Sequence, residues 1–352
     1  MGIWKMCRVL AVMMAVLLVM GIVDVWALPV REVSAEGRVD GAGMTISAGF
    51  NHSFAILPDN SLWAWGGNHG GALGDGTFTA RHNPVHVMEN VSAVSAGFVY
   101  TMAIRSDHSL WTWGTNLFGQ FGNGTTSNQL YPTPIRVMEN VAAVYALRNA
   151  GPHTMAIRTD GSLWAWGSNS HGQLGDGTII DRLRPVHVME NVAAISTGGA
   201  LGSFTMAIRT DGSLWAWGSN SIGELGDGSR IDRHRPVHIK DNILAVSAGS
   251  SHTMAIGTDG SLWTWGNNWD GQLGDGTTTP RVNPVRIMEN VAAVSAGTGH
   301  AVAIRTDGSM WTWGANSYGQ LGDGTTANRS NPVQIMDNVL AISAGSFHNN
   351  GY

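Results

Sequence analysis

A five-residue stretch built on two tryptophans, Leu62-Trp63-Ala64-Trp65-Gly66, returns nearly unchanged five more times along the chain. The second tryptophan recurs at intervals of 48, 53, 51, 48 and 48 residues. Self-similarity with a period of about 20–50 residues is typical of solenoids, propellers and arrays. The six copies hold twelve of the fifteen tryptophans. This repeat, which runs without a break from about residue 47 to 339, therefore decides the fold.

The copy between Ile243 and Ile287 shows the repeat most clearly. Short apolar runs predict strands at 244–249, 253–256, 262–265 and 285–287. The dipeptide Asp259-Gly260 predicts a two-residue hairpin, in which both central positions have positive φ. A longer glycine-rich loop joins the third strand to the fourth. Four short antiparallel strands in each repeat predict the blades of an all-β propeller.

The tryptophan pair is expected to pack neighbouring blades together. Side chains alternate along a strand, so Trp263 and Trp265 share one face, and Leu262 and Thr264 share the other. Both faces are apolar or small, which indicates a sheet packed on both sides. The small residue between the tryptophans leaves room for the next blade. The structural tryptophans are Trp63, Trp65, Trp111, Trp113, Trp164, Trp166, Trp215, Trp217, Trp263, Trp265, Trp311 and Trp313.

Counting strand types predicts six blades. There are six copies of the second strand, of the tryptophan strand, and of a fourth strand that starts just after a proline. The Ser-Ala-Gly strand occurs seven times, first at 45–49 and last at 341–345. One spare strand can close the propeller if the two ends of the chain pair within one blade. The alternative is an incomplete seven-bladed propeller. The prolines are Pro84, Pro134, Pro185, Pro236, Pro284 and Pro332.

The succession W-x-W-G-x-N, G-Q-L-G-D-G, P-V and S-A-G-x-x-H-T resembles the repeat of the regulator of chromosome condensation (RCC1) family over about residues 45–348. The resemblance implies a β-propeller, usually of seven blades. The founding eukaryotic members are exchange factors for a nuclear GTPase, so an exchange-factor-like regulator is an alternative function. Some plant members sense light through tryptophans at the Ser-Ala-Gly loops, where this chain has none.

The first 27 residues are predicted to be a secretory signal. Lys5 and Arg8 precede an apolar run at 9–23, and Val25-Trp26-Ala27 offers a cleavage site. The run is short for a membrane span, which needs about 20 residues. An uncleaved leader is the alternative and the one expected route to a membrane. Residues 28–43 are expected to be a linker and 44–352 the propeller. We therefore expect a secreted or cell-surface member of the bacterial type.

The charge and cysteine content limit the classes of partner that the chain is expected to bind and exclude disulfides from the secreted chain. Removing the leader takes away Lys5, Arg8 and Asp24 and leaves 18 basic and 24 acidic residues. No basic stripe is available for nucleic acid, which excludes that class of partner. The single cysteine, Cys7, lies in the leader, so no disulfide is expected in the secreted chain. We expect a monomer that binds a protein or a surface polymer.

Repeated polar motifs are interpreted as scaffold. The G-x-L-G-D-G segments indicate turns rather than calcium loops, because the calcium-binding repeat is much shorter. The histidines after the Ser-Ala-Gly strands alternate with Tyr100 and Phe204, which favours packing over a metal site. No phosphate loop and no G-x-S-x-G sequence occurs. We predict no catalytic residue, no metal and no cofactor. An enzyme with its site in the central channel remains the alternative. These histidines are His52, His153, His252, His300 and His348.

Candidate binding residues lie where the repeats differ. The first-to-second and third-to-fourth loops should emerge on one face and vary most, and variable loops on a rigid scaffold carry binding residues. Aromatic and arginine side chains dominate binding hot spots. The alternatives are that these rings pack over their own loops, and that the basic loops pair with their own aspartates. The candidates are Trp269, Phe118, Tyr318, His171, Ile222, Arg148, Arg233 and Arg235.

Overall fold

The computed structural model describes residues 38–39, 44–146, 153–199, 203–345 and 349–351. The chain divides into two compact units, Met1–Arg31 and Glu32–Tyr352, and all described residues belong to the second. The predicted signal, His348 and Arg148 lie outside the described residues. Within those residues there is no α-helix, only the short 3-10 turn η2 (His69–Gly71), and hence no helix long and apolar enough to span a membrane.

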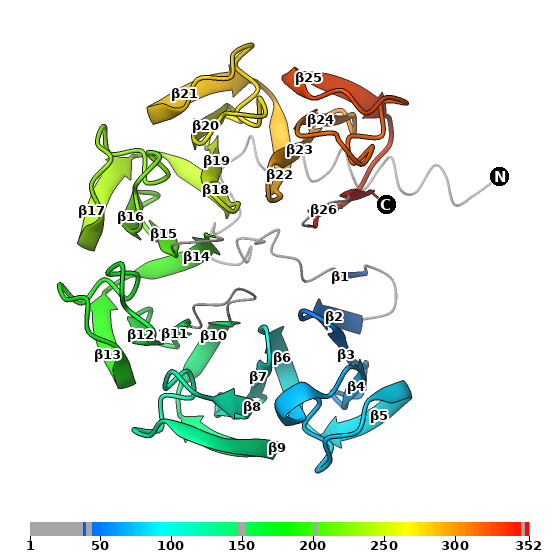
Figure 1. The fold of residues 1–352 in the computed structure, drawn as a ribbon, viewed down its shortest axis with the longest axis vertical. Coiled ribbons are helices and arrows are strands. Elements are labelled where there is room, and N and C mark those ends of the chain that lie inside the picture. The colour runs from blue at the N-terminus through cyan, green and yellow to red at the C-terminus, as the bar shows by residue number, and fades with distance from the viewer. Residues whose placement is uncertain (1–37, 40–43, 147–152, 200–202, 346–348, 352) are drawn as a thin grey trace, which may run out of the picture. The chain divides into compact units, whose positions relative to one another are not determined.

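Each of the six repeats folds into an antiparallel sheet whose four strands pair in sequence order, here called blades 1 to 6. The predicted all-β propeller of six four-stranded blades is confirmed. Figure 1 shows the Ser-Ala-Gly strands at the inner ends of the blades and the proline-containing strands at the outer ends. The inner strands are β2 (Met44–Ala48), β6 (Val91–Ala96), β10 (Val141–Ala146), β14 (Val192–Gly198), β18 (Ile243–Ala248) and β22 (Val291–Ala296).

The second strand of each blade pairs with the inner strand, and the third holds the tryptophan pair. The second strands are β3 (His52–Ile56), β7 (Tyr100–Arg105), β11 (His153–Arg158), β15 (Phe204–Arg209), β19 (His252–Gly257) and β23 (His300–Arg305). The third strands are β4 (Leu62–Gly66), β8 (Leu110–Asn116), β12 (Leu163–Gly167), β16 (Leu214–Gly218), β20 (Leu262–Gly266) and β24 (Met310–Gly314).

The outer strands begin earlier than predicted. They are β5 (Arg81–Met88), β9 (Ser127–Met138), β13 (Arg182–Met189), β17 (Arg233–Lys240), β21 (Arg281–Met288) and β25 (Arg329–Met336). In blade 5, Gly266 pairs with Arg281 and Thr264 with Val285, so a bulge intervenes and contains Pro284. An edge strand tolerates proline at a bulge because no ladder hydrogen bond is lost there. Proline therefore lies inside these strands and does not mark their start.

The first and last strands do not pair with each other. β1 (Arg38–Val39), within the segment expected to be a linker, pairs with β2 at the edge of blade 1. The seventh Ser-Ala-Gly strand, β26 (Ile342–Ala344), pairs with β27 (Asn349–Gly351) in a separate two-stranded sheet. The described residues thus hold six complete blades and a separate two-stranded sheet, and the expectation that the two ends pair within one blade is wrong.

The hairpins between the second and third strands differ from the two-residue turn predicted. In blade 5 the N–H of Gly260 donates to the carbonyl of Gly257, and the N–H of Gly257 to that of Ser261. Only the last loop residue, Gly260 (φ 76°), has positive φ. This is a three-residue loop with one left-handed position. The aspartate before it serves another purpose, because Asp259 accepts hydrogen bonds from the backbone and hydroxyl of Ser261.

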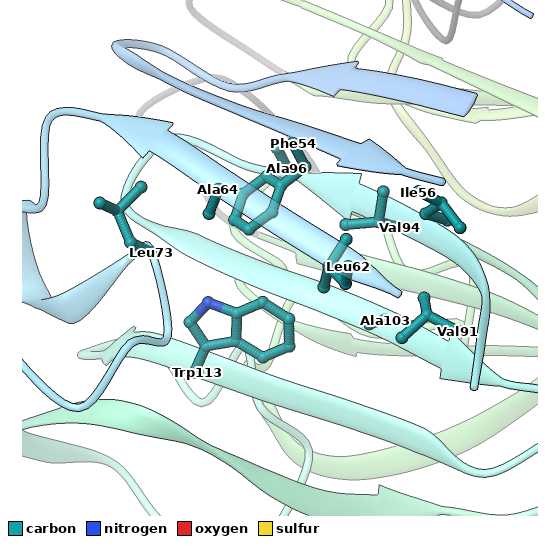
Figure 2. Packing of buried hydrophobic residues seen from close by; sticks show 10 residues of the cluster. All are labelled: Phe54, Ile56, Leu62, Ala64, Leu73, Val91, Val94, Ala96, Ala103 and Trp113. Atoms are coloured by element: carbon teal, nitrogen blue, oxygen red, sulfur yellow. The ribbon is translucent and has the colours of Figure 1, made fainter. Parts of the chain in front are cut away.

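Blade-to-blade packing is centred on the second tryptophan of each pair. Figure 2 shows Trp113 of blade 2 against Leu73 and Ala64 of blade 1, with Phe54 nearby. The small residue between the tryptophans, here Ala64, makes the room predicted for the neighbouring blade. Five of these second tryptophans are fully buried: Trp113, Trp166, Trp217, Trp265 and Trp313. The first tryptophan of each pair is half-buried and donates to a serine two residues earlier in its own blade, as Trp111 does to Ser109 at 2.9 Å.

Candidate loop-face binding site

Hydrogen bonds divide the loops between two faces as predicted. The N–H of Asn267, at the start of a third-to-fourth loop, donates to the carbonyl of Ser251 in the first-to-second loop, 2.9 Å away. The hairpin residue Thr258 instead donates to Asn242 in the turn between blades, at 2.8 Å. We call the first side of the molecule the loop face and the second the turn face.

The long loops of the loop face are fixed by a buried asparagine. In blade 5, the Asn268 amide donates to Asp275 at 3.0 Å and to the carbonyls of Thr277 and Thr279. Its oxygen accepts from the N–H of Leu273. Asp275 also accepts from the N–H of Thr277, so it caps the turn as expected for a structural aspartate. This network accounts for the G-x-L-G-D-G segment without a calcium ion.

An arginine completes the loop in five blades. Arg233 Nε lies 2.6 Å from Asp227 Oδ2, and the aspartate side chain is 6% exposed. Burial acts to raise the pKa of Asp227, but hydrogen bonds from Ser229 and Arg233 lower it below its ordinary value. The guanidinium of Arg233, a candidate binding residue, is thus engaged within its own loop. The equivalent arginines are Arg81, Arg182, Arg281 and Arg329.

Two aspartates and Arg235 in the arginine-rich loops at 181–184 and 230–235 also have local contacts. Asp181 and Asp232 accept hydrogen bonds from the N–H groups of Asn169 and Asn220, at 2.7 and 2.8 Å. Arg235 is exposed and its guanidinium lies against Gly177, where a Cβ would come within 2.5 Å of it. Of the two candidate arginines that the structure describes, Arg235 is exposed and Arg233 is bonded to Asp227.

The aromatic candidates project from rigid loops. Trp269, Tyr318 and Phe118 are 65%, 76% and 43% exposed. The N–H of Phe118 and that of Tyr318 each donate at 2.9 Å to a glutamine side chain two residues later. The N–H groups of His171 and Ile222, which are half-buried, donate in the same way to Gln173 and to the carboxylate of Glu224, each at 2.8 Å. Exposed rings on fixed backbone are preorganised for contact. The alternative, a side chain packed over its own loop, fits the half-buried His171 and Ile222 better.

One asparagine ties together the loops that carry Trp269 and Tyr318. Asn328 donates to Asp270, the residue after Trp269, at 3.0 Å. Its oxygen accepts from the N–H of Asn316, two residues before Tyr318, at 2.8 Å. These two exposed rings therefore belong to one connected surface across blades 5 and 6.

A further aromatic pair was missed by the sequence reasoning. Phe50 and Phe98 lie on the first-to-second loops of blades 1 and 2, with ring centroids 4.5 Å apart, and Phe50 is 66% exposed. The signal was present in the sequence, because two adjacent copies have phenylalanine where later copies have Ser250 and Thr298. These residues add a second exposed apolar area to the loop face.

The histidines after the inner strands are buried, as packing requires. His52 is 2% exposed, and His153, His252 and His300 are 0% exposed. The preceding glycine is needed for space: a Cβ at Gly249 would lie 2.7 Å from the His252 ring, and one at Gly198 2.5 Å from Phe204. Burial lowers the pKa of His252 to about 3, with help from nearby His300. Across the described residues, no three His, Cys, Asp or Glu side chains gather as a metal site.

Repeated four-stranded blades with variable loops on one face define a β-propeller scaffold. The chain belongs to the family of the Regulator of chromosome condensation (RCC1) repeat, which matches residues 59–104, 107–157, 160–208, 211–256, 259–304 and 307–349.

Among known proteins, the chain is 30% identical over 203 residues to the ultraviolet-B receptor UVR8 of Arabidopsis thaliana, covering 55% of this chain and 45% of the receptor. It is 28% identical over 223 residues to the mitochondrial RCC1 domain-containing protein RUG3 of the same plant, covering 58% and 48%. The chain thus spans about half the length of these relatives. The fold is similar to that of Prp20p from Saccharomyces cerevisiae, with a TM-score of 0.69, 21% identity, and coverage of 87% and 81%.

Proposed function

We propose that this chain is a non-enzymatic binding protein that grips a protein partner through its loop face, outside the cytoplasm. One observation carries the proposal: Trp269 and Tyr318 are exposed on loops that hydrogen bonds hold in place and that Asn328 links. Large exposed rings on preorganised backbone are the groups that contribute most to protein recognition. Family resemblance supports a protein as the partner, since the structure of Prp20p was described with its binding to Gsp1p and histones.

Two other roles have less support. A receptor role like that of the ultraviolet-B receptor is not favoured, because the first-to-second loops carry Phe50 and Phe98 and no tryptophan. An exchange-factor role would require an intracellular GTPase as partner, which conflicts with the secretory signal expected at residues 1–27. Function in repeated scaffolds depends on the particular loops, so the family fold alone assigns neither.

Affinity capture tests the binding face. The tagged full chain, left to undergo any processing, is used to capture proteins from the native cell envelope and surroundings, with identification by mass spectrometry. The variant W269A/Y318A/F118A is expected to lose the specific partner while its thermal denaturation is unchanged. The matched control is E89A/E139A/E190A, three exposed carboxylates of the turn face, which should capture normally. Equal capture by both variants would place the contact elsewhere.

Fractionation tests the location separately. We expect the protein in the extracytoplasmic fraction, with an amino terminus at Leu28. A chain that keeps residues 1–27 and stays with the membrane would indicate the uncleaved anchor instead. A cytoplasmic chain would contradict the proposed location without deciding the binding face.

A further inference from the structure

An arginine ends the second strand in four of the six blades and lies against the turn between blades. Arg105, Arg209 and Arg305 donate from Nε to the carbonyls of Glu89, Glu190 and Glu289, at 3.2, 3.2 and 3.3 Å. The guanidinium carbons of Arg105 and Arg158 lie 5.8 Å from the ring centroids of the first tryptophans of their blades. An aspartate two residues later completes the site, as with Arg209 and Asp211 at 3.7 Å.

Blade 5 has this site without its arginine, because the strand ends at Gly257. The surrounding backbone is the same, since Thr258 donates to Asn242 as Ser106 does to Asn90, each at 2.8 Å. What remains is a surface pocket of about 200 Å³, lined among others by Gly257, Asp259, Asp241 and Trp263. Asp241 occupies the place of Glu89, Glu190 and Glu289. Among the described residues, no hydrogen bond to the Asp241 carbonyl is formed.

Lys240 partly compensates for the missing arginine. It stands where the other turns have methionine, and it is the only lysine outside the predicted leader. Its ammonium nitrogen lies 3.9 Å from the Trp263 ring centroid and so covers the indole that a guanidinium would stack on. A compact ammonium cannot reproduce the planar fork of a guanidinium, which stacks and donates in two directions at once. The two lining carboxylates also have other neighbours: Asp241 Oδ1 lies 2.8 Å from His238 Nε2, and Asp259 Oδ2 lies 4.0 Å from Arg286. The Asp259 side chain is 67% exposed and so stays accessible to a further cation.

We propose that the pocket between blades 4 and 5 binds a guanidinium group supplied by a partner, in the position that the chain's own arginine takes in blades 2, 4 and 6. The ligand's nitrogens would donate to the Asp241 carbonyl and the Asp259 carboxylate, and its plane would lie on Trp263 as Lys240 swings aside. The site is on the turn face and is independent of the loop-face proposal. The chain's formal net charge of −5 suits a basic ligand.

The test follows Trp263 directly. The full chain is labelled with 15N on the tryptophan indoles, the Trp263 signal is assigned with Trp263→Phe, and N-acetyl-arginine amide is titrated in. We expect a saturable shift of the Trp263 signal with a Kd in the millimolar range, as for a single side chain. N-acetyl-lysine amide should leave it unmoved. Free L-arginine is titrated separately. Tighter binding of free L-arginine would indicate a small molecule as the natural ligand, and tighter binding of N-acetyl-arginine amide an arginine within a polypeptide.

Three variants make the result decisive. Gly257→Arg supplies the missing side chain, which four other blades accommodate, and should abolish the response. Lys240→Met removes the competing ammonium and should lower the Kd by about two- to fivefold. Asp259→Asn should weaken binding of the probe, because it removes one of the proposed acceptors. If Gly257→Arg fails to fold, unchanged binding in Asp259→Asn overturns the proposal instead. An unmoved Trp263 signal at 100 mM probe, an equal response to the lysine probe, or an undiminished response in a folded Gly257→Arg chain overturns the proposal.

Discussion

The indole N–H of Trp217 donates to the main-chain carbonyl of Gln173, 2.9 Å away, across the boundary between blades 3 and 4. The indole also lies against Gly175, where a Cβ would come within 2.8 Å of Nε1. The same donation recurs at four other boundaries, from Trp113, Trp166, Trp265 and Trp313. Each of blades 1 to 5 thus offers a glycine-lined socket to the tryptophan of the next blade, and this contact leads to the first prediction.

Replacing Trp217 by alanine should lower the free energy of unfolding by about 3–5 kcal/mol, because a fully buried indole and its hydrogen bond are lost. Trp65 is the matched control. It holds the same place in blade 1 but is only half-buried, and no described loop receives its indole. Trp65→Ala should therefore cost clearly less. Denaturant melts of both variants check this, and equal losses would mean that the blade boundary is not the source of the stability.

His108 occupies a left-handed hairpin position with φ 62°, where four other blades have glycine. A non-glycine residue there costs about 1–2 kcal/mol. His108→Gly is therefore expected to raise the melting temperature, and the mirror change Gly260→Ala (φ 76°) to lower it. Differential scanning calorimetry measures both. A lowered melting temperature for His108→Gly would show that the imidazole makes a compensating contact.

The loop of blade 4 should weaken when its aspartate is neutralised. Asp227→Asn removes the ion pair with Arg233 and leaves a guanidinium without its partner, at an expected cost of about 1–3 kcal/mol. Blade 2 provides the control, because it has Asn123 and Tyr131 at the equivalent places. The double variant Asp227→Asn/Arg233→Tyr should recover part of the loss in urea melts. If the double variant is as unstable as the sum of the two single changes, the residues do not act as a pair.

Acid should destabilise the fold through His252. Its pKa of about 3 in the folded chain is below the ordinary 6.5, so the unfolded chain binds a proton that the folded chain excludes. The contribution of His252 is complete above pH 6.5 and is lost as the pH falls toward 3, at up to about 1.4 kcal/mol for each pH unit. His252→Phe, which places in this slot the ring that Phe204 provides in blade 4, should flatten this dependence. Urea melts between pH 7.5 and 4.5 measure how the free energy of unfolding depends on pH. The same dependence in His252→Phe as in the unchanged chain would mean that His252 is not its source.

Much of the fold could be predicted from the repeat alone. The tryptophan pair and the small residue between them follow from alternation along a strand, and their burial agrees. Pro284 misled the prediction of the outer strand because proline usually interrupts pairing, and a bulge that accommodates it cannot be recognised from one strand. The Asp-Gly hairpin was assigned the wrong turn because the same dipeptide suits both two-residue and three-residue loops.

The binding surfaces were predictable only in part. The place of Trp269, Tyr318 and Phe118 in variable loops made them candidates, but whether they are exposed or packed over their own loops was open until the structure placed them at the surface. The aromatic pair of Phe50 and Phe98 could have been found by comparing the copies. The ion pair between Arg233 and Asp227 could not be predicted from the sequence, because the two residues meet only when the loop folds back on itself. The pocket at Gly257 needed the other blades as a reference, because an absent side chain gives no signal without knowledge of what it touches elsewhere.

In every socket the tryptophan of one blade enters the loop of the blade before it in the sequence, and this order affects how the chain unfolds. Every coupling of this kind joins one blade to its successor, so stability is transmitted along the sequence as in a one-dimensional array with nearest-neighbour terms. In blade 6 the equivalent glycine is Gly322, where a Cβ would meet Ile335 of the same blade at 3.6 Å and no indole. The blades at either end are thus each held by one such coupling and the central ones by two. Amide hydrogen exchange should consequently be fastest in blades 1 and 6, with protection rising toward blades 3 and 4.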